Sequence, residues 1–179
     1  MQAAAVSGYD IRKARPEEFQ ALGQLAVAVY ASLPGMPSMD EQPDYYGKLA
    51  DVATRASNPA ISVFTAVSPR GELLGCVDFI DDMKHYGSGG TAGTIADAAG
   101  IRLLAVKTEC RGKGVGKALT RFCIDQASQL GRKAVILHTT RVMEAAWAMY
   151  AALGFVRLPE IDFVQGNLQV FGFRLELSA

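Results

Sequence analysis

The chain has 179 residues, of which 50% are hydrophobic and 20% are charged, an ordinary balance for a globular protein. Its 18 basic and 18 acidic residues give a formal net charge of zero, so composition indicates neither a nucleic-acid partner nor a membrane partner. No apolar run approaches a membrane span, and residues 1–6 are too short and uncharged for a signal peptide. We therefore expect one cytoplasmic domain over residues 1–179, with its core at 9–177.

The first half of the chain alternates between short strand-like and helical segments. We predict a strand over residues 9–14 and a helix from Pro16 to about Ser32, because proline suits a first helical turn and apolar residues follow at helical spacing. Residues 33–44 are rich in proline and predict a loop, and residues 45–56 predict a second helix.

The middle of the chain predicts a β-hairpin followed by a loop. Ile61–Val67 and Leu73–Ile80 are apolar runs rich in β-formers, and the turn-forming residues 68–71 join them. Residues 81–93 are polar and rich in glycine, and no helix of matching period follows directly. We interpret them as a mobile loop rather than as a second phosphate site.

The second half returns to alternating strands and helices. We predict strands over 101–106, 134–137, 155–158 and 170–177, and helices over 118–130 and 143–153. Gly131 and Gly154 follow these helices and are typical helix stops. The order of elements indicates a single mixed α/β sheet flanked by helices.

A glycine-rich turn lies between the strand at 101–106 and the following helix. Gly112, Gly114 and Gly116 lack a Cβ, so they tolerate positive φ and allow close approach to the main chain. The first N–H groups of a helix have no intrahelical acceptor, and the helix dipole adds positive potential there. The pattern therefore predicts a phosphate site, to which Arg111, Lys113 and Lys117 add charge.

The turn does not fit two common phosphate motifs. A P-loop needs glycine where Arg111 stands and a hydroxyl residue where Ala118 stands, and the dinucleotide motif would end on Lys117. The segment instead resembles the pyrophosphate loop of the GNAT N-acetyltransferase superfamily. It reads Arg111-Gly-Lys-Gly114-Val-Gly116 and is preceded by Leu104-Ala105-Val106, which resembles that family's strand ending.

The resemblance implies an acetyl-CoA-dependent acyltransferase with a mostly antiparallel twisted sheet and a splayed central strand pair. It covers nearly the whole chain, with its most specific part at residues 101–155. It implies that acetyl-CoA is the acyl donor, and we expect no metal. The implied cofactor-binding residues are Leu104, Ala105, Val106, Arg111, Gly112, Lys113, Gly114, Val115, Gly116 and Lys117.

A second signature concerns catalysis. Tyr150-Ala-Ala-Leu-Gly154-Phe155 is similar to the family's Tyr-x-x-x-Gly-Phe, whose tyrosine is the general acid that reprotonates the thiolate. The alternative is that Tyr150 is a core residue, since its neighbours also follow helical spacing; beside the glycine turn we favour the acid. The resemblance also implies that a main-chain N–H of the strand ending, that of Val106, stabilises the thioester oxygen.

Two departures from the family leave the general base open. Met143 stands where many relatives have an asparagine that touches the cofactor, and residues 98–102 contain no glutamate. A water relay is one alternative to a single base. The candidate side chains are those of Asp78, Asp97, His138, Glu160 and Asp162.

Cysteines and histidines give no sign of further chemistry. Cys76, Cys110 and Cys123 cannot all pair and show no metal-binding spacing, and His85 and His138 are far apart. We interpret all three cysteines as reduced packing residues. Cys110 precedes Arg111 and is the one with a positive neighbourhood that favours a thiolate.

These features predict direct transfer of an acetyl group to a primary amine in a ternary complex. A small-molecule acceptor is favoured, such as an amino acid, a polyamine or an amine-bearing xenobiotic. One alternative is acetylation of a protein N-terminus or lysine, and another is a non-catalytic acyl-CoA sensor or interaction module. The expected partner is a small-molecule amine, not a nucleic acid or a membrane, and a homodimer is left open.

Overall fold

The computed structural model describes residues 8–178, which form two compact units. The first unit contains residues 8–78 and 103–122, and the second contains residues 79–102 and 123–178. Residues 1–6, which the sequence indicated are not a signal peptide, lie outside the described part. Within residues 8–178 no helix is both long and apolar enough to cross a membrane.

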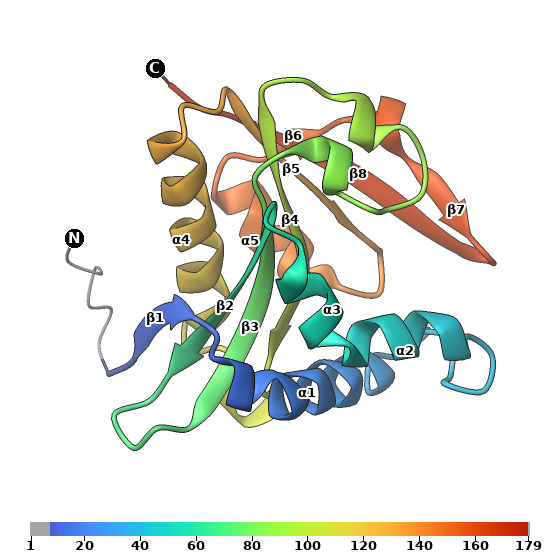
Figure 1. Cartoon of the computed structure of the whole chain (residues 1–179). Helices are drawn as coiled ribbons and strands as arrows, with labels where there is room; N and C mark the ends of the chain where they lie inside the picture. Colours follow the sequence, from blue (N-terminus) through green and yellow to red (C-terminus); the bar gives the residue numbers. More distant parts are fainter. Residues whose placement is uncertain (1–7, 179) are drawn as a thin grey trace. The chain divides into compact units, whose positions relative to one another are not determined.

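The first unit is built from a strand, a group of helices and a hairpin. In chain order these are β1 (Asp10–Lys13), η1 (Pro16–Glu18), α1 (Phe19–Ala31), α2 (Pro43–Ala50), α3 (Val52–Ser57), β2 (Ile61–Val67) and β3 (Leu73–Ile80), whose last two residues belong to the second unit. Helix α1 packs against α2 and α3, and α3 packs against β2 (Figure 1). The buried face of α1 carries the apolar residues at helical spacing, among them Leu22, Leu25 and Val29, as predicted.

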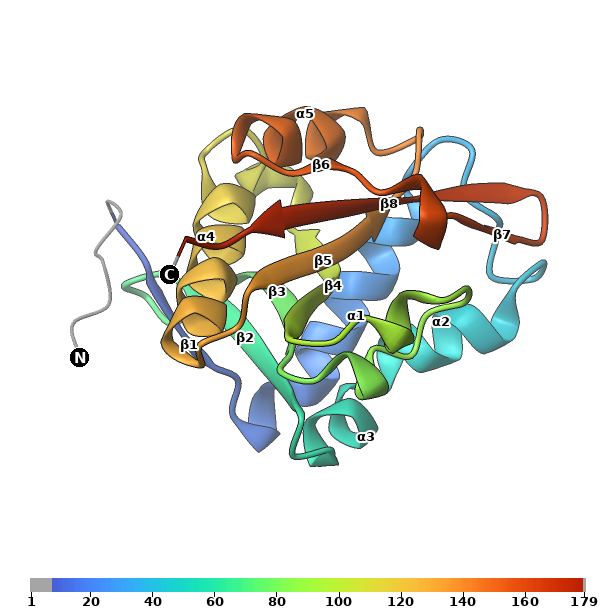
Figure 2. The ribbon, with the colours of Figure 1, turned by 90° about the horizontal axis from the view of Figure 1, so that it is seen from above.

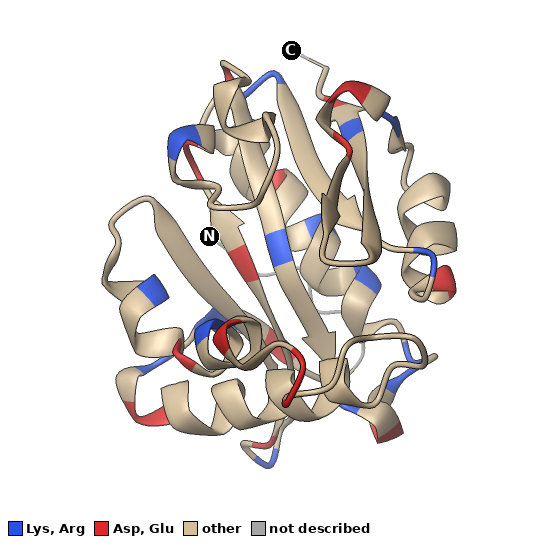
Figure 3. Cartoon of the chain, turned by 90° about the vertical axis from the view of Figure 1, so that its right-hand side faces the viewer, with Lys and Arg blue, Asp and Glu red and all other residues tan. Residues whose placement is uncertain are grey.

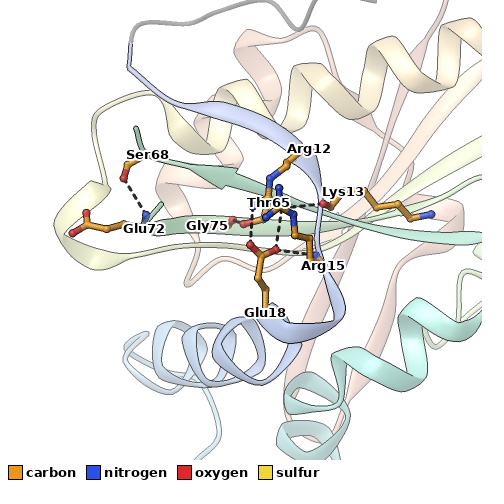
Figure 4. A network of polar contacts seen from close by, with 8 residues as sticks. All are labelled: Arg12, Lys13, Arg15, Glu18, Thr65, Ser68, Glu72 and Gly75. Carbon is orange, nitrogen blue, oxygen red and sulfur yellow. Dashed lines mark hydrogen bonds and ion pairs between the residues drawn. The ribbon is translucent and has the colours of Figure 1, made fainter. Parts of the chain in front are cut away.

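An ion pair joins β1 to the start of the helical segment. Arg12 donates two hydrogen bonds to the Glu18 carboxylate, at 2.7 and 3.0 Å, and Glu18 also accepts from the Arg15 N–H at 2.8 Å (Figure 4). The hydrogen bonds from Arg12 have the largest effect and, with the bond from the Arg15 N–H, lower the pKa of Glu18 to about 2. Glu18 therefore fixes the chain where β1 turns into η1.

The helix predicted over residues 45–56 is two helices. Asp51 has φ −87° and ψ 68°, outside the helical region, so α2 ends before it and α3 begins after it. The Asp51 carboxylate accepts a hydrogen bond from the Thr54 N–H at 3.1 Å and caps α3. The break therefore has a local cause, an aspartate acting as the N-cap.

The second unit contains the last four strands of the chain. They are β5 (Ala134–Thr139), β6 (Val156–Arg157), β7 (Phe163–Gln165) and β8 (Leu168–Glu176), with α5 (Glu144–Ala152), η2 (Met83–His85), η3 (Ala92–Thr94) and η5 (Pro159–Ile161) between strands. Figure 2 shows α5 beside β6 and β8, and the rings of Trp147 and Phe173 meet edge to face at 4.8 Å. The core of this unit includes Ile136, Leu137 and Phe173.

Two further elements run from one unit into the other. They are β4 (Ala98–Val106) and α4 (Val115–Gln129), and β4 is followed by η4 (Thr108–Cys110). Leu130 was predicted on the apolar stripe of α4, but it is 54% exposed. The reason is that α4 ends at Gln129 and Gly131, at φ 72°, turns the chain.

The strand order is β1-β2-β3-β4-β5-β8-β6, and β7 pairs with β8, which confirms the predicted mixed α/β sheet. Strands β4 and β5 are parallel, whereas β1–β2, β5–β8, β6–β8 and β7–β8 are antiparallel. The β4–β5 ladder runs from Ala98–Ala134 to Ile101–Leu137, although both strands continue beyond it. Leu103 then adopts φ 55°, which interrupts the extended backbone, and the early end of the ladder fits the predicted splayed strand pair.

Candidate active site

The glycine loop (residues 111–117) connects η4 to α4 within the first unit. Gly112 and Gly114 have φ values of 74° and 83°, in the region that favours glycine. A Cβ at either position would meet no atom within 4 Å, so the space above both residues is open. The Ala118 N–H donates to the Gly114 carbonyl at 2.9 Å, which marks Gly114 as the residue where the helical bonds begin.

The main-chain N–H groups of this loop are free to bind a ligand. From Gly112 to Lys117, none of these N–H groups has an acceptor in residues 8–178. Arg111, Lys113 and Lys117 are exposed, and within the same described range none of them is ion-paired. Consecutive unpaired N–H groups at a helix start, with cationic side chains beside them, have the chemistry of a phosphate site.

The strand ending before the loop is held from two sides within the first unit. The Tyr30 hydroxyl donates to the Leu104 carbonyl at 2.9 Å, and the Lys107 N–H donates to the Leu74 carbonyl at 2.9 Å. Ala105 is buried, whereas Leu104 and Val106 are half-buried. The structure thus places Leu104, Ala105 and Val106 in the same unit as the glycine loop, and their role in cofactor binding stays a prediction.

Tyr150 belongs to the second unit, on α5. It is 5% exposed, and its ring meets Phe155 edge to face at 5.7 Å, so the core contacts that the sequence offered as an alternative role are present. Burial raises the pKa of its hydroxyl well above 10. A phenol with such a pKa is protonated at neutral pH, which a proton donor requires. The acid role of Tyr150 stays a prediction.

Met143 directly precedes α5, at the position where the family resemblance implied an asparagine. It occupies the N-cap position and makes no side-chain capping hydrogen bond. Its sulfur instead accepts a weak hydrogen bond from the Thr139 hydroxyl at 3.5 Å. Met143 therefore connects the start of α5 to the end of β5 but adds no polar group for a ligand.

Two of the carboxylates considered as general bases are ion-paired. Asp78 is buried, and its Oδ2 lies 2.6 Å from Nε of Arg55. Asp97 is exposed, with Oδ2 3.7 Å from Nζ of Lys133. The ion pair with Arg55 gives Asp78 a structural role, and its role as the base stays a prediction.

Two further carboxylate candidates, Glu160 and Asp162, lie in the second unit. The hydrogen bonds from Arg157, at 2.5 and 2.8 Å, hold the pKa of Asp162 below its usual value. Glu160 is exposed, and its main-chain carbonyl accepts a hydrogen bond from the Thr91 hydroxyl at 3.3 Å. Asp162 thus acts as a salt-bridge partner, and Glu160 is a solvated side chain.

His138 makes a hydrogen bond through each ring nitrogen. Nε2 lies 2.8 Å from the Ile161 carbonyl, and Nδ1 lies 3.0 Å from the Tyr86 hydroxyl. Because a carbonyl oxygen only accepts, Nε2 carries the proton and Nδ1 accepts from Tyr86. Burial lowers the pKa of His138, and the charge of Arg102 lowers it further. His138 is therefore neutral, with both nitrogens occupied.

A comparison of the chain with family models decides its membership. The model described as the acetyltransferase (GNAT) family matches residues 24–155. The chain belongs to the GNAT family. This assignment makes it an acyltransferase, as the sequence predicted.

Individual proteins agree with the GNAT assignment. The chain is 29% identical over 125 residues to the uncharacterised N-acetyltransferase YjgM of Escherichia coli, which covers 68% of this chain and 72% of that protein. It is similar in fold to the PaiA N-acetyltransferase of Thermoplasma acidophilum, solved with coenzyme A, with a TM-score of 0.69 and 19% identity. That match covers 92% of this chain and 97% of the Thermoplasma chain. It is also similar in fold to the spermidine N-acetyltransferase of Vibrio cholerae, solved with coenzyme A and spermine, with a TM-score of 0.63 and 20% identity. That match covers 95% of this chain and 96% of the Vibrio chain.

The cysteines of this GNAT protein are not paired to each other. All three are free; Cys76 and Cys123 are buried, and Cys110 is half-buried. Burial raises the pKa of the Cys76 thiol to about 12, so this residue is an inert packing group. Within residues 8–178 no group of three or more His, Cys, Asp or Glu side chains is placed to hold a metal ion.

One cluster in this GNAT protein was not predicted from the sequence. Residues 81–93, interpreted above as a mobile loop, carry Tyr86, which is 1% exposed and fixed by its hydrogen bond to His138. A Cβ on Gly100 would lie 2.5 Å from the Tyr86 ring, so glycine is required there. The sequence offered one signal, which was the presence of the aromatic Tyr86 in a polar, glycine-rich segment. That signal did not identify His138 or Gly100 as its partners, because both lie far away in the sequence.

Proposed function

We propose that this GNAT protein transfers the acetyl group of acetyl-CoA to the primary amine of a small molecule, by direct transfer in a ternary complex. The observation that carries the proposal is the row of unpaired N–H groups from Gly112 to Lys117 at the start of α4. The coenzyme A present in the Thermoplasma neighbour supports this choice of phosphate ligand. The amine acceptor is supported by relatives named as N-acetyltransferases and by the spermine-bound Vibrio enzyme.

The glycine loop fits the pyrophosphate of coenzyme A. The open space above Gly112 and Gly114 is space that a Cβ would fill, so the main chain is accessible to phosphate oxygens. Arg111, Lys113 and Lys117 would pair with the phosphate charges from the exposed side of the loop. Acetyl-CoA supplies an activated acyl group when it is bound.

Three further roles complete the proposed mechanism. Leu104, Ala105 and Val106 would bind the pantetheine through their main chain, with the Val106 N–H donating to the thioester oxygen. Tyr150 would donate its hydroxyl proton to the leaving thiolate, and its raised pKa means that the phenol is protonated at neutral pH. Water would take the proton of the acceptor amine, because Asp78, His138 and Asp162 are each occupied by a partner.

The test is release of coenzyme A from acetyl-CoA in the presence of pooled small amines, with product mass measured in parallel. We expect release that depends on the amine and a product heavier by one acetyl group. Hydrolysis without acetylated amine, or binding without turnover, would contradict the proposed transfer. A peptide pool in place of the amines tests the protein-acetylating alternative with the same readout.

A further inference from the structure

Two residues lie at the point where the parallel ladder of the second unit ends. The last pair of the β4–β5 ladder is Ile101–Leu137, so Arg102 and His138 are the first residues beyond it on the two strands. Neither is fully buried. Arg102 also lies two residues before Leu104–Val106, the strand ending proposed above to bind the pantetheine and the thioester oxygen.

Tyr86 fixes both of these residues. Its hydroxyl donates to Nδ1 of His138 at 3.0 Å, and its main-chain carbonyl accepts from Nη1 of Arg102 at 2.9 Å. The Arg102 guanidinium also lies 5.6 Å from the centre of the Tyr86 ring. Because Tyr86 is itself wedged against Gly100, the guanidinium is held in place by a rigid group. We call Arg102, Tyr86 and His138 the Arg102 cluster.

The charge of Arg102 has no counter-ion. Within residues 8–178 no carboxylate oxygen lies within 4.0 Å of its guanidinium, and its partners are a neutral carbonyl and a neutral ring. Arg157 in the same unit is, by contrast, paired in a bidentate manner with Asp162. His138 is neutral and adds no second charge. A half-buried guanidinium with unused donors has the geometry for binding a carboxylate.

We propose that Arg102 binds a carboxylate of the acceptor, so that the acceptor is an amine of the amino-acid type rather than a polyamine. This inference rests on the proposed N-acetyltransferase function and narrows its acceptor. A carboxylate supplies the missing counter-ion with two parallel hydrogen bonds. A polyamine would instead bring a second positive charge toward the guanidinium, which like-charge repulsion disfavours.

The experiment compares each amino acid with its decarboxylated amine. Suitable pairs are alanine with ethylamine, phenylalanine with phenethylamine and lysine with cadaverine. For the parent we expect kcat/KM to favour the acid by roughly 10- to 100-fold, the range for a hydrogen bond to a charged group. In Arg102→Ala this preference should disappear, because the acids lose their counter-ion and the amines are freed from the repulsion of the guanidinium. Arg102→Lys should keep part of the preference.

The control is Arg141→Ala. Arg141 is in the same unit and stacks on Trp147 at 4.9 Å, so the substitution removes the same charge without touching the Arg102 cluster. It should leave the acid preference intact. A parent that acetylates amines without preferring the acids, or an Arg102→Ala variant that keeps the preference, would overturn the inference and leave the proposed function standing.

Direct binding separates the two proposals when turnover is not seen. The amino acids are titrated into the protein saturated with coenzyme A, and binding is measured by calorimetry for parent and Arg102→Ala. Binding that is lost in the variant supports the inference even if no amine is acetylated, and the missing turnover then counts against the proposed function alone. No binding of any amino acid to the parent would overturn the inference.

Discussion

Replacing Gly114 by alanine tests the glycine loop without changing its charge. Gly114 has φ 83°, and a left-handed conformation costs a residue with a Cβ about 1–2 kcal/mol. For a chain of this length, that loss lowers the melting temperature by roughly 2–8 °C. The added methyl group also occupies the open space where we place the pyrophosphate.

The size of the binding effect follows from mass action. A ligand at 100 times its Kd stabilises the folded state by about 2.7 kcal/mol, a rise of roughly 5–11 °C for a protein of this size. If Gly114→Ala weakens binding about 100-fold, the same concentration gives only about 0.4 kcal/mol, or roughly 1–2 °C. The assay is thermal unfolding with and without coenzyme A.

A matched variant separates strain from ligand binding. Gly131 has φ 72°, and a Cβ there would also meet no atom within 4 Å, but it lies after the end of α4. Gly131→Ala should lower the melting temperature of the free protein to a similar extent and keep the full coenzyme A shift. A Gly114→Ala variant with the parent's shift would refute the loop as the pyrophosphate site, as would a loss shared by both variants.

Three other substitutions test residues away from the glycine loop. Tyr150→Phe should reduce the single-turnover rate by roughly 10²- to 10⁴-fold with little change in coenzyme A affinity, and a parent-like rate would make Tyr150 a core residue only. Asp78→Asn removes the charge partner of the buried Arg55 and should lower the free energy of unfolding by about 3–5 kcal/mol, measured by urea denaturation. A variant that keeps its stability but loses turnover would make Asp78 the base instead. Glu18→Gln should cost about 1–2 kcal/mol at pH 7, because Arg12 stabilises the ionised carboxylate and partial exposure weakens the pair. This difference should fade as the pH falls from about 4.5 toward 2, and an equal difference at pH 2 and 7 would contradict the assignment.

Local patterns predicted the strands that are bounded by strong turn signals. Ile61–Val67 and Leu73–Ile80 have the predicted bounds, because two apolar runs flank a turn whose Gly71 adopts φ 83°. The glycine loop was predicted for a similar reason, since both its conformation and its charge are set by neighbours in sequence. The short strand Phe163–Gln165 was missed because three residues give no measurable periodicity.

Properties that depend on distant partners could not be predicted. The burial of Tyr86 needs Gly100 and His138, and nothing in the polar segment around Tyr86 points to either. The lack of a counter-ion beside Arg102 likewise depends on residues from distant parts of the chain, so the sequence around Arg102 does not predict it. The roles of the individual site residues and the single-domain organisation stay predictions.

The order in which the chain is synthesised differs from the order in which its compact units can be completed. The first unit needs residues 103–122 as well as residues 8–78. The ribosome must therefore synthesise residues 79–102, which belong to the second unit, before the first unit can be completed. The sheet of the second unit has to wait longer, because β8 pairs with β5, β6 and β7 and is made after all three. A nascent chain halted before Leu168 would therefore expose the unpaired edges of these three strands on the ribosome, a situation in which chaperones commonly act.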